Sequence, residues 1–278
     1  MTDKYAVIGN PIAHSKSPEI HTMFAEQFKD QPAGDMVYKD RVLAPLDGFA
    51  ATIERLRNEG YKGCNVTVPF KFEAFKFATS NTPRAHAAHA ANTLKFIDRE
   101  IIGDNTDGAG LVADIERNLG FPLQDKRVLL MGAGGAAYGV TLPLLNAGVF
   151  LTVSNRTMKN AENLVQYFSF ENGRISCNSY VENKDKQFHI VINATSSGLS
   201  NEIYEYPLLP SGIFAPGALA YDMMYGKETP FMKFAREQGA AIVSDGLGML
   251  VEQAAEAFFI WRGVRPDTAP VLAKLRLS

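Results

Sequence analysis

The chain has 278 residues, of which 46% are hydrophobic and 21% are charged. This composition is typical of a folded protein with a sizeable core and excludes a disordered chain, and the length suits two domains better than one. The formal net charge of -2 gives no reason to expect nucleic acid as a partner.

Membrane, secretion and metal signals are absent from the sequence. No run approaches the roughly 20 apolar residues that span a membrane, and the N-terminus lacks the basic and apolar segments of a secretory signal, so we expect a cytoplasmic protein. Cys64 and Cys177 lack metal-ligand spacing and suit a reduced compartment. His86 and His89 share a predicted helix without a cysteine or carboxylate nearby, so no metal is expected.

The N-terminal part of the chain alternates between strand and helix patterns. A polar loop follows the first apolar run, and a hairpin turns at Asp98 and Arg99. The hydrophobic periodicity predicts strands at 5–8, 36–42, 64–68, 92–96 and 100–103, and helices from 17 to 28, 46 to 56, 82 to 89 and 107 to 119. This alternation predicts an α/β fold.

Several polar residues at element ends have two interpretations. Ser17, followed by Pro18, predicts a helix N-cap, but with Ser15 it could instead bind a small carboxylate. Lys71 falls in the first turn of a helix, where a cation opposes the macrodipole, so it is either a surface lysine or one held for chemistry. Asp107 is predicted to cap the helix that runs to Leu119.

A glycine-rich turn near the middle of the chain predicts a nucleotide site. The apolar run 127–131 predicts a buried strand, and a helix over 136–147 and a strand over 149–153 follow it. Between strand and helix lie Gly132, Ala133, Gly134, Gly135, Ala136 and Ala137. Glycines in this context permit the tight turn and the close approach of a pyrophosphate to the amides at the helix start.

The residues after the next strand select the nucleotide. An NAD site usually has an acidic residue about 20 positions after the first glycine, which binds the ribose hydroxyls. This chain has Asn155, Arg156 and Thr157 instead. Because Arg156 attracts a ribose 2′-phosphate, the pattern favours NADP. The alternative is a similar unit without a nucleotide, in which the arginine is merely solvated.

The last part of the chain continues the alternation, with predicted strands at 188–192, 218–222 and 240–243 and a helix at 161–168. The polar loop 193–198 follows a strand and either lines the nicotinamide side of a nucleotide site or forms a plain turn. A final helix opens near Gly246. It carries Gln253, a polar residue among apolar ones, whose amide is either functional or else exposed or hydrogen-bonded within the core.

Several of these stretches together identify a family. They are Gly9-Asn-Pro-Ile-Ala-His-Ser-Lys-Ser-Pro18, Asn65-Val-Thr-Val-Pro-Phe-Lys71, Gly103-Asp-Asn-Thr-Asp-Gly108, Gly132-Ala-Gly-Gly-Ala136, Asn155-Arg-Thr157 and Gly246-Leu-Gly-Met-Leu250 with Gln253-Ala-Ala255. In this order they resemble the bacterial shikimate dehydrogenases over almost the whole chain.

The resemblance implies an N-terminal α/β substrate domain over 1–107 and 246–278, and a Rossmann-like, doubly wound NADP-binding domain over 108–245. The C-terminal helical segment would return to the substrate domain. The implied activity is the reversible NADPH-dependent reduction of 3-dehydroshikimate to shikimate, in the biosynthesis of aromatic amino acids. Either a monomer or a homodimer is compatible with the sequence.

The resemblance also implies roles for individual residues. Lys71 and Asp107 would be catalytic, although the sequence does not decide which of them transfers the proton. The residues that would hold the substrate are Ser15, Ser17, Thr67, Asn92, Gln253 and, from the nucleotide side, Tyr225. Those that would hold the cofactor are Gly132, Ala133, Gly134, Gly135, Ala136, Asn155, Arg156, Thr157, Lys159, Thr195, Met223 and Gly246.

The chain departs from the family pattern in two places. His89 stands where members often have a glycine, so the backbone there is expected to differ. Lys159 and Asn160 stand where some members carry a second arginine, so the 2′-phosphate would rest mainly on Arg156. The rival interpretations are a dehydrogenase that also accepts quinate and NAD, and a catalytically silent NADP-binding sensor.

Overall fold

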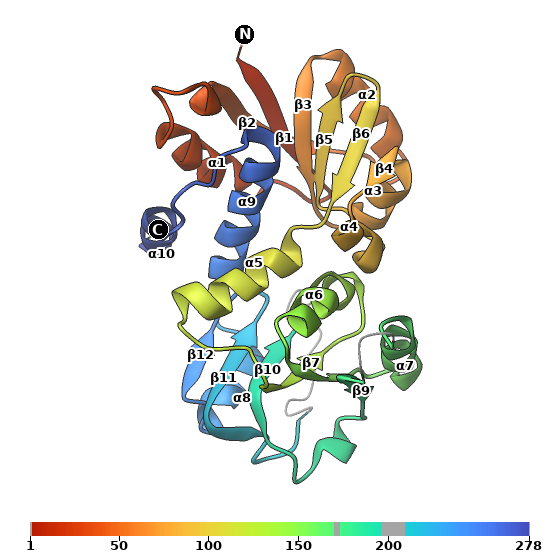
Figure 1. Ribbon diagram of the computed structural model, residues 1–278, viewed down its shortest axis with the longest axis vertical. Coiled ribbons are helices and arrows are strands. Elements are labelled where there is room, and N and C mark those ends of the chain that lie inside the picture. The colour runs from red at the N-terminus through yellow and green to blue at the C-terminus, as the bar shows by residue number, and fades with distance from the viewer. Residues whose placement is uncertain (1, 170–172, 196–208, 278) are drawn as a thin grey trace. The chain divides into compact units, whose positions relative to one another are not determined.

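The computed structural model describes residues 2–169, 173–195 and 209–277 (Figure 1). It divides into two compact units, each built around a six-stranded sheet. The first unit comprises residues 1–110 and 250–278, and the second comprises residues 111–249. The chain therefore leaves the first unit once and returns to it once.

The sheet of the first unit is mixed, with the strand order β2-β1-β3-β5-β6-β4. Its strands are β1 (Asp3–Gly9), β2 (Met36–Leu43), β3 (Tyr61–Val66), β4 (Ser80–Asn81), β5 (Thr93–Ile97) and β6 (Glu100–Asp104). β1 lies parallel to β2 and β3, whereas β5 is antiparallel to both β3 and β6. The hairpin between β5 and β6 turns at Asp98, as predicted, with a positive φ of 49°.

Helices cover both faces of this sheet. The helices of this unit are α1 (Ser17–Glu26), α2 (Phe49–Asn58), α3 (Lys71–Phe77), α4 (Pro83–Ala88) and α10 (Ala269–Arg276), together with parts of α5 (Asp107–Ala113) and α9 (Leu247–Arg262), which cross its boundary. Side chains alternate along a strand, so neighbouring residues face different helices. Cys64 and Val66 pack in the apolar core with Phe49 and Ile53 of α2. On the other face Tyr5 stacks on Trp261 of α9.

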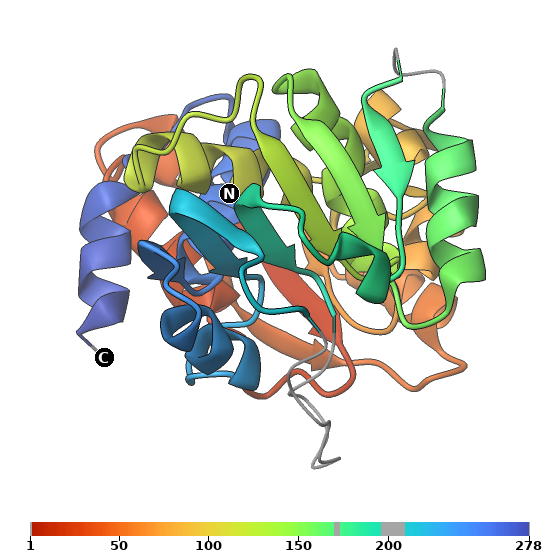
Figure 2. The ribbon, with the colours of Figure 1, turned by 90° about the horizontal axis from the view of Figure 1, so that it is seen from below.

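The sheet of the second unit is entirely parallel, with the order β12-β11-β10-β7-β8-β9 (Figure 2). Its elements are β7 (Arg127–Met131), α6 (Gly135–Asn146), β8 (Phe150–Ser154), α7 (Met158–Tyr167), β9 (Ile175–Cys177), β10 (Phe188–Asn193), β11 (Phe214–Asp222), α8 (Pro230–Glu237) and β12 (Ile242–Ser244). The strand order reverses between β7 and β10. This reversal makes the fold doubly wound, as predicted, and ligands bind at such a switch point.

The interior of the second unit explains why its strands are apolar throughout. Leu129, Val191 and Ala220 are fully buried and pack with Phe231 and Phe234 of α8. A parallel sheet covered on both faces leaves no strand face in water, which produces continuous apolar runs rather than alternation. The predicted strands at 127–131 and 188–192 are confirmed on this basis.

Some elements differ from the prediction. The helix expected from 107 to 119 is α5 followed by a π-helical turn, Asp114–Asn118. The buried Asp114 carboxylate accepts hydrogen bonds from Tyr221 and Asn118, which fixes this turn against β11. The strands β4 and β9 and the helices α8 and α10 were not predicted. The strands have only two and three residues, which is too short for a periodic pattern.

The described residues show neither a membrane-spanning helix nor a cluster of metal ligands. No helix there is long and apolar enough to cross a membrane. In the same part of the chain no group of three or more histidine, cysteine or acidic side chains could hold a metal ion.

Candidate functional site

An ion pair between Lys71 and Asp107 lies at the centre of the candidate site in the first unit. Lys71 Nζ donates a hydrogen bond to Asp107 Oδ2 over 2.7 Å. The lysine is the first residue of α3, where the helix dipole disfavours a cation, and the carboxylate compensates for this. The side chains are 29% and 10% exposed, so Lys71 does not extend freely into water and Asp107 is almost enclosed.

The second oxygen of the Asp107 carboxylate belongs to a buried polar cluster. Asn92 Nδ2 donates to Asp107 Oδ1 over 2.8 Å and also lies 3.2 Å from Gln253 Oε1. Thr106 donates its N–H to Asn92 Oδ1 over 2.9 Å. Gln253 is 9% exposed, so its amide is not an exposed group but a buried one whose oxygen and nitrogen are both hydrogen-bonded. The fold thus gathers Lys71, Asn92, Asp107 and Gln253 from four separate segments.

Two of the expected helix caps are not caps. Lys16 occupies the N-cap position of α1 without a side-chain hydrogen bond, and Ser17 is the first helical residue. The Ser17 hydroxyl instead accepts from Ser15 Oγ over 3.2 Å. Asp107 is itself the first residue of α5, and Asn105 Oδ1 accepts its N–H over 3.1 Å. Neither side chain therefore caps its helix. Ser17 bonds to Ser15, and Asp107 bonds to Lys71.

Thr67 lies beside the loop that follows β1. Its N–H donates to Ile8 O over 2.9 Å, because β3 and β1 are parallel neighbours. A Cβ added to Gly9 would lie 2.5 Å from Thr67 Cγ2, so only glycine permits this approach. Thr67 and the loop that carries Ser15 and Ser17 therefore extend from the carboxyl ends of two adjacent strands.

A buried polar layer behind these residues was missed by the sequence reasoning. Asn65 Oδ1 accepts from Tyr38 Oη over 2.8 Å and contacts His21 Nε2 at 3.2 Å. Asn65 Nδ2 donates to Thr93 Oγ1 over 3.1 Å. Burial lowers the pKa of His21 to about 3 and raises that of Tyr38 well above its usual value. The available signal was the polar Asn65 between the apolar residues Cys64 and Val66 of a predicted strand.

His89 keeps a backbone conformation typical of glycine. It follows α4 with φ 48° and ψ 27°, in the left-handed region, and its N–H donates to the carbonyls that end the helix. Histidine is more costly than glycine in this conformation but does not prevent it. The backbone change expected at this position therefore does not remove the left-handed turn that precedes Asn92.

In the second unit, the glycine-rich turn has the geometry of an anion cradle. Gly132 has φ 108°, and a Cβ there would lie 3.1 Å from the carbonyl oxygen of Ala194. Its N–H donates to Ser154 O over 2.8 Å, which fixes the turn to β8. Beside Gly134 no atom lies within 4 Å of the place of a Cβ, and α6 begins at the next residue. This leaves open space at the N-terminus of α6, a place where helices commonly bind anions.

The residues after β8 lie on the surface of the second unit. Arg156 and Thr157 are exposed, and Asn155 Nδ2 donates to Thr157 O over 2.9 Å. Lys159 Nζ lies 3.5 Å from a carboxylate oxygen of Glu162, and both side chains are more than half exposed. Both cations therefore lie at the surface just after β8, and Lys159 has an acidic neighbour on α7.

A second cluster lies at the carboxyl ends of β10 and β11. Asn193 Oδ1 accepts from Thr195 Oγ1 over 2.7 Å, and its Nδ2 donates to Asp222 Oδ2 over 3.2 Å. Asp222 Oδ1 accepts the N–H of Met224, whose carbonyl accepts the N–H of Gly246 over 2.8 Å. Burial raises the pKa of Asp222. This network supports the loops of the predicted residues Thr195, Met223 and Gly246.

These cofactor candidates all lie at the carboxyl ends of the strands. Asn193 stands opposite both Met131 and Asp222 in the strand register, so the cluster and the glycine turn begin at the same level. Tyr225 follows Asp222 by three residues and is half-buried, and burial raises its pKa. The remainder of the predicted polar loop, 196–198, lies outside the described residues.

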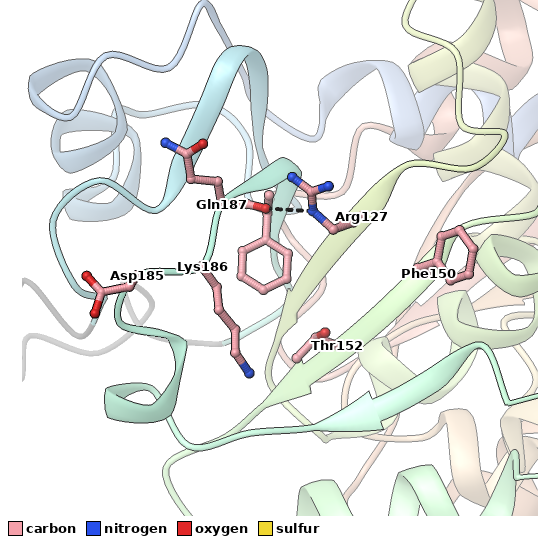
Figure 3. Close-up of a pocket in the computed structure, with 7 residues that line it drawn as sticks. Arg127, Phe150, Thr152, Asp185, Lys186 and Gln187 are labelled. Atoms are coloured by element: carbon pink, nitrogen blue, oxygen red, sulfur yellow. Dashed lines mark hydrogen bonds between the residues drawn. The ribbon is translucent and has the colours of Figure 1, made fainter.

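An open pocket of about 410 Å³ lies at the other end of these strands (Figure 3). It is lined by Arg127, Phe150, Thr152, Asp185, Lys186, Gln187 and Phe188. Arg127, Phe150 and Phe188 begin β7, β8 and β10, which places the pocket at the amino ends of the strands. It is therefore separate from the cofactor candidates at the carboxyl ends.

Three family models match the chain. Residues 7–94 match the shikimate dehydrogenase substrate binding domain, and residues 114–202 match shikimate / quinate 5-dehydrogenase. Residues 246–276 match the shikimate 5′-dehydrogenase C-terminal domain.

Full-length relatives agree with these matches. The shikimate dehydrogenase (NADP(+)) of Methylobacillus flagellatus is 58% identical over 99% of this chain and 100% of its own. An Ael1 enzyme from Pseudomonas putida is 48% identical, with a TM-score of 0.90 over 99% of this chain and 98% of that one. The shikimate 5-dehydrogenase of Thermus thermophilus in complex with NADP(H) and shikimate is 29% identical, with a TM-score of 0.85 over 99% of both chains. The chain belongs to the shikimate dehydrogenase family.

Proposed function

We propose that this chain catalyses the reversible NADPH-dependent reduction of 3-dehydroshikimate to shikimate, as an NADP-dependent oxidoreductase of the shikimate pathway. The observation that carries the proposal is the Lys71–Asp107 pair at 2.7 Å, set against Asn92 and Gln253 in the first unit. It joins an ammonium and a carboxylate to neutral amides, which are the groups that a polyhydroxy acid with a reacting carbonyl requires.

Lys71 and Asp107 act together at the reacting carbon. In the reduction, negative charge grows on the carbonyl oxygen, and the Lys71 ammonium stabilises that charge. The pair supplies the proton that completes the hydroxyl, and it takes the proton back in the oxidation. Asp107 orients the lysine, while Asn92 occupies the other carboxylate oxygen and keeps the carboxylate fixed.

The substrate is held by residues around this pair. Ser15 and Ser17 supply hydroxyls near the start of α1, where the helix dipole favours a carboxylate. Thr67, Asn92 and Gln253 bind the ring hydroxyls with neutral donors and acceptors, and Tyr225 contributes from the second unit. These assignments follow the family motifs, and two contacts support them, one between Ser15 and Ser17 and one between Asn92 and Gln253.

The second unit holds NADP, which supplies or accepts the hydride when it is bound. The turn from Gly132 to Ala136 receives the pyrophosphate, because Gly134 leaves open space beside the N-terminus of α6. The exposed Arg156 binds the ribose 2′-phosphate, with Asn155 and Thr157 beside it and Lys159 as a weaker contributor. Thr195, Met223 and Gly246 support the nicotinamide end.

The proposal includes a division of labour between the units. Residues 1–107 with 246–278 form the substrate domain, and residues 108–245 form the NADP-binding domain. The partners are the two small molecules, without nucleic acid or membrane, for a monomer or a homodimer in the cytoplasm. The free thiols of Cys64 and Cys177 fit a reducing compartment.

The direct test is a steady-state absorbance assay of NADPH formation by the purified chain. Shikimate and quinate are each offered with NADP and with NAD. The expected result is a kcat/KM for shikimate with NADP that exceeds the other three values. Comparable values for quinate or for NAD would replace the proposal with a broader dehydrogenase. No turnover in any of the four reactions, with NADP still bound in calorimetry, would identify a nucleotide sensor instead.

A further inference from the structure

The side-chain amide of Asn65 has every hydrogen-bonding position engaged. It is 5% exposed and lies on β3, on the face opposite to Cys64 and Val66. Its oxygen meets Tyr38 Oη at 2.8 Å and His21 Nε2 at 3.2 Å. Its nitrogen donates to Thr93 Oγ1 over 3.1 Å and to Asn92 O over 3.3 Å. An amide can use two acceptor sites and two donors, so this one is saturated.

The surroundings fix the direction of these bonds. Asn65 Oδ1 can only accept, so the hydroxyl of Tyr38 and the Nε2 of His21 must both donate to it. Nε2 of His21 therefore carries a proton. Its Nδ1 is buried and has no hydrogen-bond acceptor among the described residues, so a second proton there is disfavoured and the imidazole is neutral. Two donors on one side and two acceptors on the other hold the Asn65 amide in a single orientation.

From Asn65 the bonds continue to the catalytic pair. Thr93 faces Asn65 across the strand pair, receives the amide hydrogen, and donates its own hydroxyl to Asn92 Oδ1 over 3.0 Å. The nitrogen of the Asn92 amide is thereby turned toward Asp107 Oδ1, at 2.8 Å. Each member of the chain donates to the next, so the orientation set at Asn65 is passed to Asp107.

We propose that Asn65 and Thr93 are positioning residues of the reaction, which keep the Asn92 amide turned so that its NH₂ group faces Asp107. The proposal rests on the proposed function, because it assigns the catalytic pair to shikimate oxidation and reduction. Neither residue touches the reacting atoms, and both act through Asn92.

The orientation matters because of what an inverted Asn92 would do. Its carbonyl oxygen would then face Asp107 Oδ1 and Gln253 Oε1, which are both acceptors. An acceptor turned toward a carboxylate disfavours the charged form of that carboxylate. The charged group in contact with Asp107 is Lys71, from α3. Asp104 lies three residues back and is bound by Arg84, which also binds Glu256 of α9.

The test uses Thr93→Val, which removes the hydroxyl at nearly constant volume, and Thr93→Ser, which keeps it. The matched control is Thr52→Val. Thr52 is a buried threonine of the same unit, and its hydroxyl donates to the carbonyl of Gly48, the residue just before α2, away from Asn92. For each protein, kcat and KM for shikimate are measured across pH, together with the thermal midpoint.

We expect Thr93→Val to lower kcat by roughly threefold to tenfold, the equivalent of one neutral hydrogen bond, since Thr106 still holds Asn92 from the other side. The low-pH limb of its activity profile should move to higher pH. Thr93→Ser should restore both, and Thr52→Val should change stability without changing either.

Three outcomes would overturn the proposal. They are an unchanged kcat and pH profile in Thr93→Val, a Thr93→Ser variant as slow as Thr93→Val, and the same loss in Thr52→Val. If Thr93→Val does not fold, Tyr38→Phe decides instead, because it removes one donor from Asn65, and an unchanged kcat and pH profile there refutes the inference. A wild-type chain that is inactive with shikimate and NADP would refute the proposed function, not this step.

Discussion

The candidate sites of the two units are built from different parts of the polypeptide. In the first unit, side chains make the site, and Lys71, Asn92 and Asp107 hold one another through buried hydrogen bonds. In the second unit, backbone makes most of it, through the turn at Gly132 and the free amides at the start of α6. A substitution among these site residues of the first unit should therefore damage chemistry, and one in the turn of the second unit should damage cofactor affinity.

The difference follows from what each unit has to bind. A pyrophosphate is recognised by N–H groups that every residue carries, so conformation decides and glycine is the requirement. A ring with several hydroxyls needs donors and acceptors in fixed places, and only particular side chains provide them. The following variants are ordered from the largest expected effect to the smallest.

Replacing Lys71 with alanine should have the largest effect. We expect kcat to fall by a factor on the order of 10² to 10⁴, because the group that stabilises and protonates the developing oxyanion is lost, while shikimate binding changes much less. Lys76→Ala is the control, since Lys76 is an exposed lysine of the same helix. Turnover close to that of the control would exclude Lys71 from the chemistry.

Gly132→Ala should weaken the binding of NADPH more than it slows the chemical step. With φ at 108° and the carbonyl of Ala194 at 3.1 Å, a Cβ forces the turn to move at a cost of about 1–3 kcal/mol. The KM for NADPH should rise about tenfold or more, with kcat at saturation nearly unchanged. Gly212→Ala is the control. Gly212 also has a positive φ, but no atom lies near the added Cβ, so the KM for NADPH should stay unchanged. Equal effects of both would show that the turn is not a binding element.

Arg156→Asp should invert the cofactor preference. Loss of a charge-assisted bond to the 2′-phosphate is worth about 1.5–3 kcal/mol, so the KM for NADPH should rise roughly 10- to 100-fold while that for NADH changes little. Lys159→Ala should have a smaller effect because Glu162 already engages this lysine. Parallel losses for both cofactors in Arg156→Asp would mean that Arg156 does not contact the phosphate.

Replacing His21 with glutamine should have the smallest effect, on the pH dependence of the free energy of unfolding. Burial lowers its pKa from 6.5 to about 3, so the unfolded chain takes up a proton near pH 6 that the folded chain does not. The free energy of unfolding therefore falls as the pH drops below 6.5. Between pH 7 and pH 5 the wild type should lose about 2 kcal/mol more than His21→Gln, measured by urea denaturation. Identical losses in both proteins would show that His21 is not buried in its neutral form.

The sequence was most informative where local rules decide the structure. The glycine turn, the strands beside it and the helix α6 depend on residues close together in the chain, and they were predicted from it. The resemblance to the family assigned the predicted catalytic roles to Lys71 and Asp107. The electrostatic need for a partner of Lys71 was also foreseeable, because a lysine at a helix start requires compensation.

What the sequence could not supply are contacts between distant segments. Ser17 and Asp107 have the local chemistry of caps, yet Ser15 and Lys71 engage their side chains instead. Asn65 was passed over because its partner Tyr38 lies 27 residues away, on another strand. The tertiary contacts override local preference at these positions, which are the ones around the candidate site.

The return of the chain to the first unit has a consequence for the order of synthesis. Gln253 and most of α9 are made after the whole of residues 111–249, although they contact Asn92 and Thr106. On a ribosome the second unit can close before the first, contrary to the usual order in which N-terminal domains fold first. Until α9 emerges, the polar side chains of Asn92 and Thr106 lack their last partner, so nascent chains should acquire the capacity to bind nucleotide before they acquire a finished substrate site.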